Sequence, residues 1–434
     1  MTPEALLDTV VQSQDLEDRL DAIEQIGQLK HTKAVGPLVQ RLKDAPDQER
    51  IFLCHALGRI ADARAVAPLV SMLKADSEDV RGEAFSALLQ IGYSRAKFMP
   101  PDAQGDASSD PRMALTQIAW PADMEAIQIL LSSITDSDPE IRIGCAYTLG
   151  RLGIGAALEK LAFLLAHDLD SDVRAAAAFA MGDLGESGDS RVKPHLVKAW
   201  DENQDHLECC VAIIRALAGI QGRELADLFT EATAHQDERV RQLAAMALGQ
   251  TPTDSSTRLL RLLNDPSNNV KRIAIGVLGR SKHPNTVQAL VNITVGTAAE
   301  IRFAVASALT HQPTEIVHDV LRRNLNTADA EKRAAATFLV GRLGPNDLLL
   351  NAAKDPDPQV RKAAALASGT SAEPQFSKIL KEALTDDVWF VRVAAAEGLR
   401  RLGSVDALSE LRAALADDHP VVRNAAKTAI EGLS

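Results

Sequence analysis

The densest group of metal-binding residue types in the sequence is the stretch HLECC, which contains His206, Cys209 and Cys210. On a helix this spacing places the three side chains on one face, where imidazole and thiolate groups could bind zinc or copper. A tetrahedral site needs a fourth ligand, which His195 would have to supply. The two adjacent cysteines could instead form a redox pair. Because cysteine is often fully buried, we favour a third interpretation, packing inside the fold.

Signatures of catalysis are absent from the sequence. It contains no G-x-x-x-x-G-K loop for phosphates, no G-x-S-x-G turn for a nucleophile and no C-x-x-C pair. The ten histidines are scattered along the chain, and the acidic residues gather in turns, where helix capping explains them. We therefore expect no catalytic residue and no cofactor, and the sequence leans against an enzyme.

Aromatic residues form a second set of candidates, suited to contact with a partner. Only 3% of the residues are aromatic, yet several lie near the ends of one Pro- and Ser-rich segment, residues 93–121. Either these side chains fold back onto the neighbouring helices or the segment contacts a partner, and both interpretations stay open. The candidates in this segment are Tyr93, Arg95, Phe98, Met99 and Trp120.

Two further aromatic residues, Trp389 and Phe390, stand at the start of an expected helix where other copies of the pattern carry polar residues. They either anchor the joint between two repeats or form an exposed hydrophobic contact site. Trp200, by contrast, follows an amphipathic stretch, and we expect it in the core.

The elements that carry these residues are repeated. The phrase SDVRAAAAFAMGDLG at 171–185 returns as VRGEAFSALLQIG from Val80, as IRIGCAYTLGRLG from Ile141 and in further copies, mostly about 31 residues apart. Arg19 begins a weaker copy, and Cys210 and Lys271 replace the arginine in two others. The repeat arginines are Arg50, Arg81, Arg142, Arg174, Arg241, Arg302, Arg333, Arg361, Arg392 and Arg423.

Each repeat reads as two helices. The first begins near the arginine, is rich in alanine and reaches a glycine about eight residues later. The second carries leucines at helical spacing, and an Asp-rich turn leads to the next arginine. We expect the arginine to form a charge-assisted bond to a turn aspartate and so to tie consecutive repeats together. A row of ligand-binding arginines is the alternative.

These phrases resemble the short HEAT-like repeats found in phycobilisome lyase subunits. The resemblance implies an all-α fold, a right-handed α-solenoid of about twelve to thirteen two-helix repeats, with the second helices on a concave face that binds partners. On this interpretation residues 1–434 form a single continuous solenoid. Residues 3–13 would be an N-terminal half-repeat cap, 93–121 an insertion in the third repeat and 419–434 a C-terminal half-repeat cap.

The charge is uneven along the chain, whose formal net charge is −12. Residues 1–217 hold 21 Lys and Arg against 34 Asp and Glu, whereas the remainder holds 26 against 25. This balance disfavours a nucleic-acid partner, although a basic groove in the second half stays open. The sequence has no apolar run long enough for a membrane span, and its start lacks the features of a signal peptide. Four cysteines fit a reducing compartment, so we expect a cytoplasmic protein.

Three functions are compatible with these observations. The first is a non-catalytic protein-binding scaffold that uses the concave second-helix face and the 93–121 insertion. The second, which the family resemblance suggests, is a phycobilin-lyase-like component or a chaperone of a chromophore protein. The third is a nucleic-acid-binding HEAT-like protein. The first needs no further motif and is the prediction, with a protein as partner and self-association left open.

Overall fold

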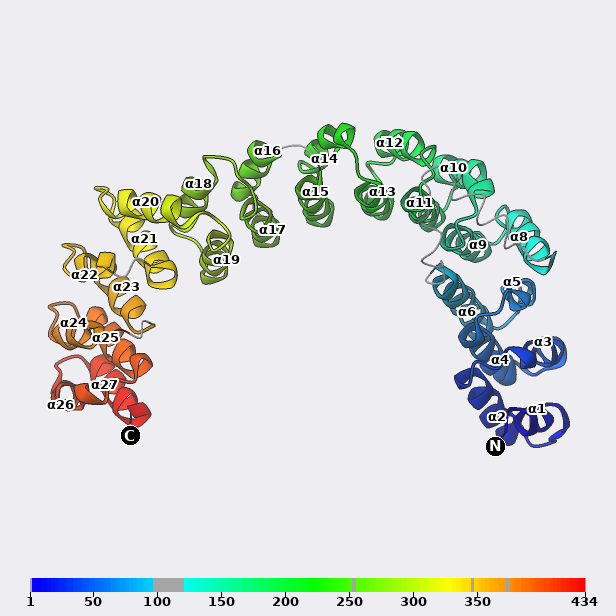
Figure 1. The fold of residues 1–434 in the computed structure, drawn as a ribbon, viewed down its shortest axis with the longest axis horizontal. Coiled ribbons are helices and arrows are strands. Elements are labelled where there is room, and N and C mark those ends of the chain that lie inside the picture. Colours follow the sequence, from blue (N-terminus) through cyan, green and yellow to red (C-terminus); the bar gives the residue numbers. More distant parts are fainter. Residues whose placement is uncertain are drawn as a thin grey trace. The chain divides into compact units, whose positions relative to one another are not determined.

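The computed structural model describes residues 2–96, 121–251, 255–344, 347–370, 373 and 375–433. Every regular element in these residues is a helix, so the predicted all-α fold of helix pairs is confirmed. The chain divides into two compact units, Met1–Leu228 (unit 1) and Phe229–Ser434 (unit 2). Within each unit the helices alternate between two rows, as Figure 1 shows.

One row contains the helices that carry the repeat arginine or its replacement, called the arginine helices below. In unit 1 they are α2 (Leu16–Gln28), α4 (Asp47–Ile60), α6 (Glu78–Ala96), α9 (Pro139–Arg151), α11 (Ser171–Glu186) and α13 (Leu207–Ile220). In unit 2 they are α15 (Glu238–Gln250), α17 (Asn268–Leu278), α19 (Ala299–Leu309), α21 (Ala330–Leu343), α23 (Pro358–Ser368), α25 (Trp389–Leu402) and α27 (Pro420–Leu433).

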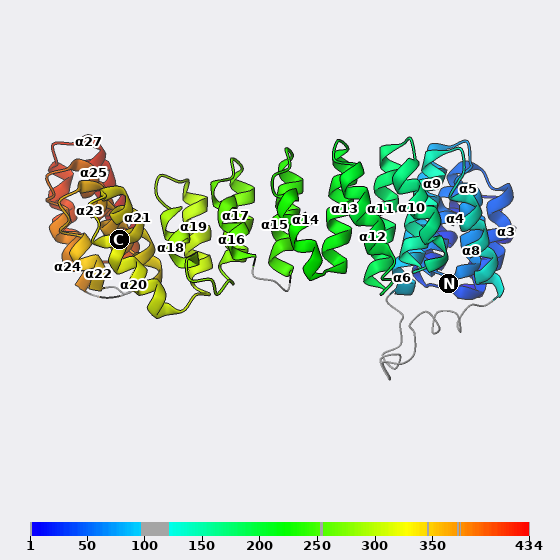
Figure 2. The ribbon, with the colours of Figure 1, turned by 90° about the horizontal axis from the view of Figure 1, so that it is seen from above.

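The other row contains the leucine helices. In unit 1 they are α1 (Pro3–Gln12), α3 (Val35–Asp44), α5 (Val66–Met72), α8 (Pro121–Ser133), α10 (Leu158–His167) and α12 (Val192–Glu202). The next leucine helix, α14 (Ala226–Ala232), contains the boundary between the units. In unit 2 the leucine helices are α16 (Ser256–Arg261), α18 (Thr286–Asn292), α20 (Thr314–Leu325), α22 (Asp347–Ala352), α24 (Gln375–Ala383) and α26 (Leu408–Ala413). Short 3₁₀ turns precede or follow several of them, and Figure 2 shows the helices of each unit lying side by side.

Turn aspartates start the arginine helices. Asp138 accepts a hydrogen bond from the backbone N–H of Glu140 at 2.9 Å, and Asp170 accepts one from Asp172 at 2.7 Å. Pro139 occupies the first turn of α9, where its missing N–H costs nothing. The Asp-rich turns therefore cap the helices that follow them, as the sequence predicts.

Small residues set the spacing of the arginine helices. A Cβ on Gly150 of α9 would lie 2.5 Å from the Cα of Ala180 in α11, so the two backbones approach too closely for any side chain at this position. In unit 2 a Cβ on Gly341 would lie 2.3 Å from the Cβ of Ala367. The leucine helices have bulkier side chains and fewer contacts with one another.

The closer spacing of one row determines how each unit bends. The more tightly packed row must lie on the inner side of a bend, and within each unit the arginine helices occupy that side (Figure 1). The prediction that the second helices form the concave face is therefore wrong within each unit. The leucines suggested that face, but the glycine–alanine contacts bring the first helices closer together.

The ends of the chain carry helices where half-repeat caps are predicted, α1 and α27. The predicted insertion begins in the last turn of α6 and ends at the start of α8, and residues 97–120 lie outside the described residues. Trp200 is 2% exposed, so its predicted core position is confirmed. None of the helices in the described ranges combines the length and the apolar character needed to cross a bilayer.

Candidate functional site

The repeat arginines are held in the turns between repeats. Arg142 donates from Nε and Nη2 to the carboxylate of Asp168 in the next turn, at 2.8 and 2.9 Å. Its Nη1 donates to the carbonyl oxygens of Asp136 and Ser137 in its own turn. The bond to the turn aspartate that the sequence predicts is therefore present. The same bidentate pair joins Arg241 to Asp265, Arg333 to Asp355, Arg361 to Asp386 and Arg392 to Asp417.

These pairs keep the aspartates charged. Burial alone would raise the pKa of Asp168, but hydrogen bonds from Arg142 and from the backbone of Asp170 outweigh it, and the pKa is lowered. For Asp417 the bond from Arg392 is the largest influence, and the pKa falls to about 2. The pairs thus stabilise the native turns at neutral pH.

Several of these aspartates accept from two arginines. Asp355 accepts from Arg333 at its carboxylate and from Arg361 at its backbone oxygen. The arrangement continues to the C-terminal helix, with Asp386 between Arg361 and Arg392 and Asp417 between Arg392 and Arg423.

Other repeat arginines do not bond to the aspartate of the next turn. Arg174 faces the turn that contains Gln204, and its Nη1 donates to the carbonyl oxygens of Asp168 and Leu169. Arg81 pairs with Glu140, while Asp136 at the equivalent turn position pairs with Lys74. Arg50 pairs with Asp47, and Arg302 stands over the ring of Phe338.

The HLECC stretch lies where α13 begins. Cys209 and Cys210 are fully buried, and their thiols approach backbone oxygens of Ser171 and Asn203 at 3.4 and 3.3 Å. Burial raises the pKa of Cys210 to about 11, which disfavours the thiolate that a metal or a redox reaction requires. His206 precedes the helix as its N-cap residue. In the described part of the chain no three His, Cys, Asp or Glu side chains are grouped as metal ligands.

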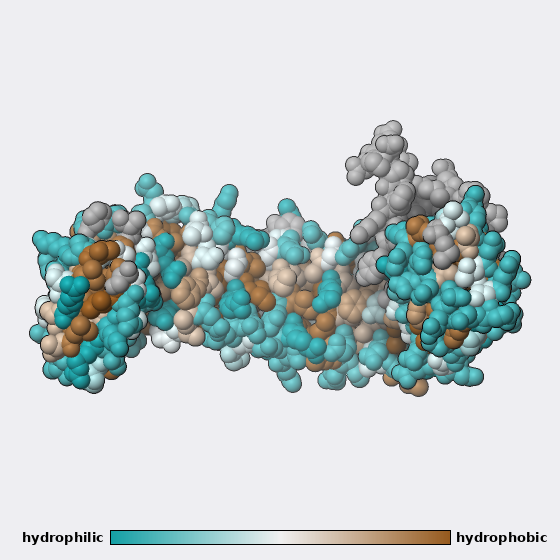
Figure 3. Space-filling view, turned by 90° about the horizontal axis from the view of Figure 1, so that it is seen from below, coloured by the Kyte–Doolittle hydropathy of each residue, from teal (hydrophilic) through white to brown (hydrophobic). Residues whose placement is uncertain are grey.

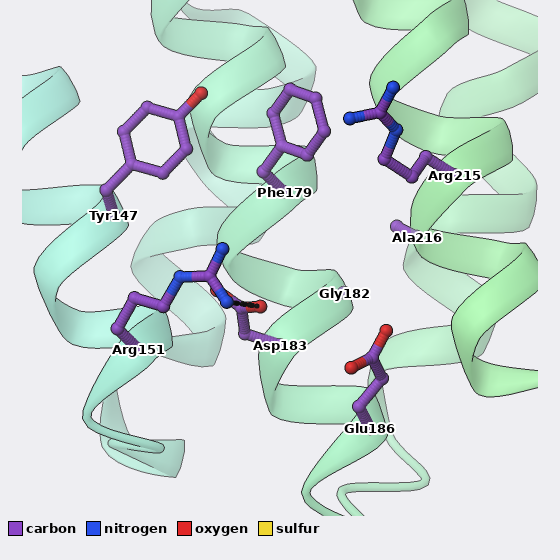
Figure 4. Close-up of a pocket in the computed structure, with 8 residues that line it drawn as sticks. All are labelled: Tyr147, Arg151, Phe179, Gly182, Asp183, Glu186, Arg215 and Ala216. Atoms are coloured by element: carbon purple, nitrogen blue, oxygen red, sulfur yellow. Dashed lines mark hydrogen bonds and ion pairs between the residues drawn. The ribbon is translucent and has the colours of Figure 1, made fainter. Parts of the chain in front are cut away.

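A groove opens on the arginine helices of unit 1. It has a volume of about 360 Å³ and lies across α9, α11 and α13 (Figure 4). The residues that line it are Tyr147, Arg151, Phe179, Gly182, Asp183, Glu186, Arg215 and Ala216. We call it the unit 1 groove.

Aromatic rings form one wall of the unit 1 groove. The rings of Tyr147 and Phe179 are stacked, with centroids 6.0 Å apart and planes inclined by 26°. Phe85 of α6 extends the row on one side, with its centroid 6.2 Å from that of Tyr147. Arg215 extends it on the other, with its guanidinium carbon 5.6 Å from the centroid of Phe179. Partly buried rings beside an exposed arginine are typical of protein-binding surfaces.

Charged residues form the floor of the groove, where Arg151 pairs with Asp183 at 2.9 Å. Burial raises the pKa of Asp183 to about 6, although Arg151 opposes the rise, and the nearby Glu186 adds to it. In Figure 4 Arg151 reaches toward Asp183, while Glu186 stands apart on the same helix. The groove therefore changes charge close to neutral pH.

We expect the carboxyl group of Asp183 to titrate near pH 6 when followed by NMR. Because its pKa is raised, protonation relieves the burial of a charge, so this group adds stability as the pH falls from 7 through 6. Arg151→Met should move the midpoint higher, since Arg151 opposes the rise. Asp168, whose pKa is lowered, is the internal control. A midpoint near the ordinary value of about 4 would contradict the assignment.

The residues predicted as binding candidates fall in different places. Tyr93 and Arg95 belong to the last turn of α6, and Phe98, Met99 and Trp120 lie outside the described residues. Their role in binding stays a prediction.

Trp389 is 41% exposed and stacks on His419 of the following turn, with ring centroids 4.3 Å apart. Phe390 is partly buried beneath Lys362. Trp389 therefore contacts the next repeat and also presents surface to solvent, and the role of this pair in binding stays a prediction.

The unit 1 groove was not predicted. Tyr147 and Phe179 each stand five residues after a repeat arginine, and Arg215 stands five after Cys210, which replaces one. This shared position is a signal in the sequence. The position is informative because the arginine helices form the inner row of each unit, so these side chains lie on one surface.

Comparison with known proteins identifies the repeats. A sequence model described as HEAT repeats matches residues 3–88, 105–182, 255–340 and 346–431. A search of curated proteins gives no match.

Among solved structures, one of Kap95p with RanGDP has 13% identity and a TM-score of 0.52 over 100% of this chain. This chain spans 61% of the length of that one. An engineered protein has 19% identity and a TM-score of 0.32, covering 99% of this chain and 98% of its own. The CpcE–CpcF complex of phycocyanin lyase from Nostoc sp. PCC7120 has 20% identity and a TM-score of 0.33, covering 59% and 92%. At these identities the similarity to Kap95p concerns the fold alone.

Proposed function

The chain belongs to the HEAT repeat family, and from this premise we propose that it is a non-catalytic scaffold that binds a partner protein. The partner would lie on the arginine helices of unit 1, in the groove across α9, α11 and α13. Stacked repeats present an extended surface of this kind without any catalytic residue.

The row of Phe85, Tyr147, Phe179 and Arg215 is the observation that carries this proposal. Aromatic rings offer a large contact area at a small cost in side-chain entropy, and aromatic residues and arginine dominate binding energy at interfaces. The Arg151–Asp183 pair and Glu186 beside them would orient a polar group of the partner. Figure 3 shows patches of hydrophobic surface among hydrophilic surface in both units.

The 93–121 insertion remains the second proposed contact. It follows Phe85 on the same helix, α6, and its first turn carries Tyr93 and Arg95. A partner in the groove that continues along the aromatic row would therefore approach the helix from which the insertion starts.

The proposal is tested by affinity purification from the source cell with quantitative mass spectrometry. We expect the double variant Phe179→Ala and Arg215→Ala to lose a specific partner by about tenfold or more, since each substitution removes a central contact. The matched control is Phe163→Ala on α10, which removes a ring that is 60% exposed on the leucine row. Deleting residues 96–112 in a separate variant measures the contribution of the insertion.

The remaining outcomes discriminate among the alternatives. A partner retained by the double variant and lost by the deletion would move the interface to the insertion. Equal loss in the Phe163→Ala control would contradict a groove-specific interface. A coloured tetrapyrrole that copurifies with every variant would favour the lyase-like component, and nucleic acid in all samples would favour the third function.

A further inference from the structure

A second surface, on the arginine helices of unit 2, carries a group of positive charges, whereas the unit 1 groove holds two arginines and two carboxylates. Its residues lie on α17, α19, α21 and α23 and in the turn after α17, and in the described residues none of its cations is ion-paired to a carboxylate. We call it the basic face. It consists of Arg272, Arg280, Arg302, Arg342 and Lys362, with the rings of Phe303 and Phe338 between them.

One arginine of the basic face, Arg302, has no turn aspartate to pair with. Where Arg333 reaches Asp355 and Arg361 reaches Asp386, Arg302 faces a turn with Thr327 at the equivalent position, six residues before the next repeat arginine. Its guanidinium stands over the ring of Phe338 at 5.2 Å, and its buried Nε has no acceptor. A donor without an acceptor is costly, so a ligand oxygen here would be favoured.

A second arginine joins the first across two rings. The guanidinium of Arg342 lies 4.3 Å from the centroid of Phe303 and 5.3 Å from that of Phe338. The two rings meet edge to face at 5.6 Å, and Phe303 is 46% exposed. The rings fix the guanidinium groups in place and leave their N–H edges to donate to a carboxylate.

The neighbouring repeats continue the positive charge on equivalent positions. Arg280 stands nine residues after Lys271, as Arg342 stands nine after Arg333, and both are exposed. Arg272 and Lys362 stand one residue after their repeat position, as Phe303 does. Since Phe303 and Arg342 touch, these two sets of positions share one surface.

We infer that the basic face binds an extended acidic peptide segment of a partner protein. Carboxylates spaced along such a segment would accept bidentate bonds from Arg302 and Arg342, and its apolar parts would lie on Phe303. This inference is independent of the unit 1 groove, where Arg151 is already paired with Asp183.

Nucleic acid fits this face less well than a peptide. A single strand binds by stacking its bases flat on open aromatic rings, and here arginine already lies over both Phe303 and Phe338. An apolar peptide side chain needs only the exposed part of Phe303, which is 46% exposed.

The test measures the fluorescence anisotropy of a labelled poly-glutamate peptide titrated with the full chain. Single-stranded poly-dT of equal length is the comparison probe. We expect poly-glutamate to bind more tightly than poly-dT, with an affinity that falls as salt rises. Arg302→Gln with Arg342→Gln should weaken binding by about tenfold per arginine.

The matched control is Arg322→Gln with Arg412→Gln, which removes the same charge from exposed positions on leucine helices of unit 2. Its affinity should stay within about twofold of the wild type, because distant exposed charges are screened. A second, milder variant guards against poor folding of the double variant. Arg342→Lys keeps the positive charge but loses the bidentate guanidinium, so its affinity should lie between those of the wild type and the double variant. Equal loss in both double variants, tighter binding of poly-dT, or no binding of poly-glutamate would overturn the inference.

Discussion

Gly150→Ala is expected to destabilise unit 1 by about 3 kcal/mol, although alanine is the better helix former. The added Cβ would lie 2.5 Å from the Cα of Ala180 and 2.9 Å from its backbone oxygen. No rotation of a side chain relieves a clash with backbone, so α9 and α11 must move apart. The measurement is the free energy of unfolding in urea, followed by circular dichroism.

Gly82→Ala in α6 provides the control of opposite sign. Nothing lies within 4 Å of a Cβ at this position, so only the helix propensity changes. We expect a gain of about 0.5–1 kcal/mol. If Gly150→Ala also stabilised the protein, the close contact between the arginine helices would not limit their spacing, and the explanation of the inner row would be wrong.

Arg241→Ala is expected to destabilise unit 2 by about 3–5 kcal/mol at pH 7, because it leaves a buried carboxylate without its partner. Asp265 is 7% exposed and accepts from Nε and Nη2 of Arg241 at 2.8 and 3.0 Å. Urea unfolding at a series of pH values measures the effect and its pH dependence.

The contribution of Asp265 to the free energy of unfolding should change with pH in opposite directions in the wild type and in Arg241→Ala. In the wild type, burial tends to raise the pKa of Asp265, but Arg241 and the backbone of Ser267 lower it. Its contribution is therefore full above about pH 4 and is lost as the pH falls further. Without Arg241, burial raises the pKa, so the variant gains stability as the pH falls from 7 toward 4. A gap that stays constant across this range would contradict the account.

Arg81→Ala is the matched control for the carboxylate bond. Arg81 and Arg241 both donate from Nη1 to two carbonyl oxygens of their own turn. They differ in the carboxylate that they pair with, because the Glu140 side chain is 57% exposed whereas Asp265 is buried. We expect Arg81→Ala to cost about 2 kcal/mol less than Arg241→Ala.

Much of the fold follows from local chemistry that the sequence displays. Asp138 and Asp170 cap helices because their side chains reach nearby N–H groups, and Arg142 meets Asp168 because the repeat length fixes their separation. These contacts depend on positions within one repeat or between neighbours, so the repeat pattern was sufficient to predict them.

Which helices form the inner face, and where the binding surfaces lie, depends on small differences in helix spacing added over many repeats. The sequence of a single repeat does not predict this total. The bend of each unit results from many small differences in helix spacing, such as that at Gly150, and a leucine pattern does not report them. Tyr147 and Phe179 looked like ordinary apolar positions until neighbouring helices brought them together. The free guanidinium of Arg302 follows from the residue at Thr327 in another turn, and only the geometry shows which acceptor is missing.

The doubly bonded aspartates have a consequence for cooperativity along unit 2. In a one-dimensional nearest-neighbour description, each shared aspartate adds to the coupling energy between adjacent repeats. From Arg333 to Arg423 the series is unbroken, so these repeats should open and close as one block. The couplings between α17 and α19 and between α19 and α21 lack this aspartate, since Gly296 and Thr327 stand at its position, and local opening should begin in this stretch. A ligand that bridged Arg302 and Arg342 would restore the coupling between α19 and α21 and lengthen the cooperative block.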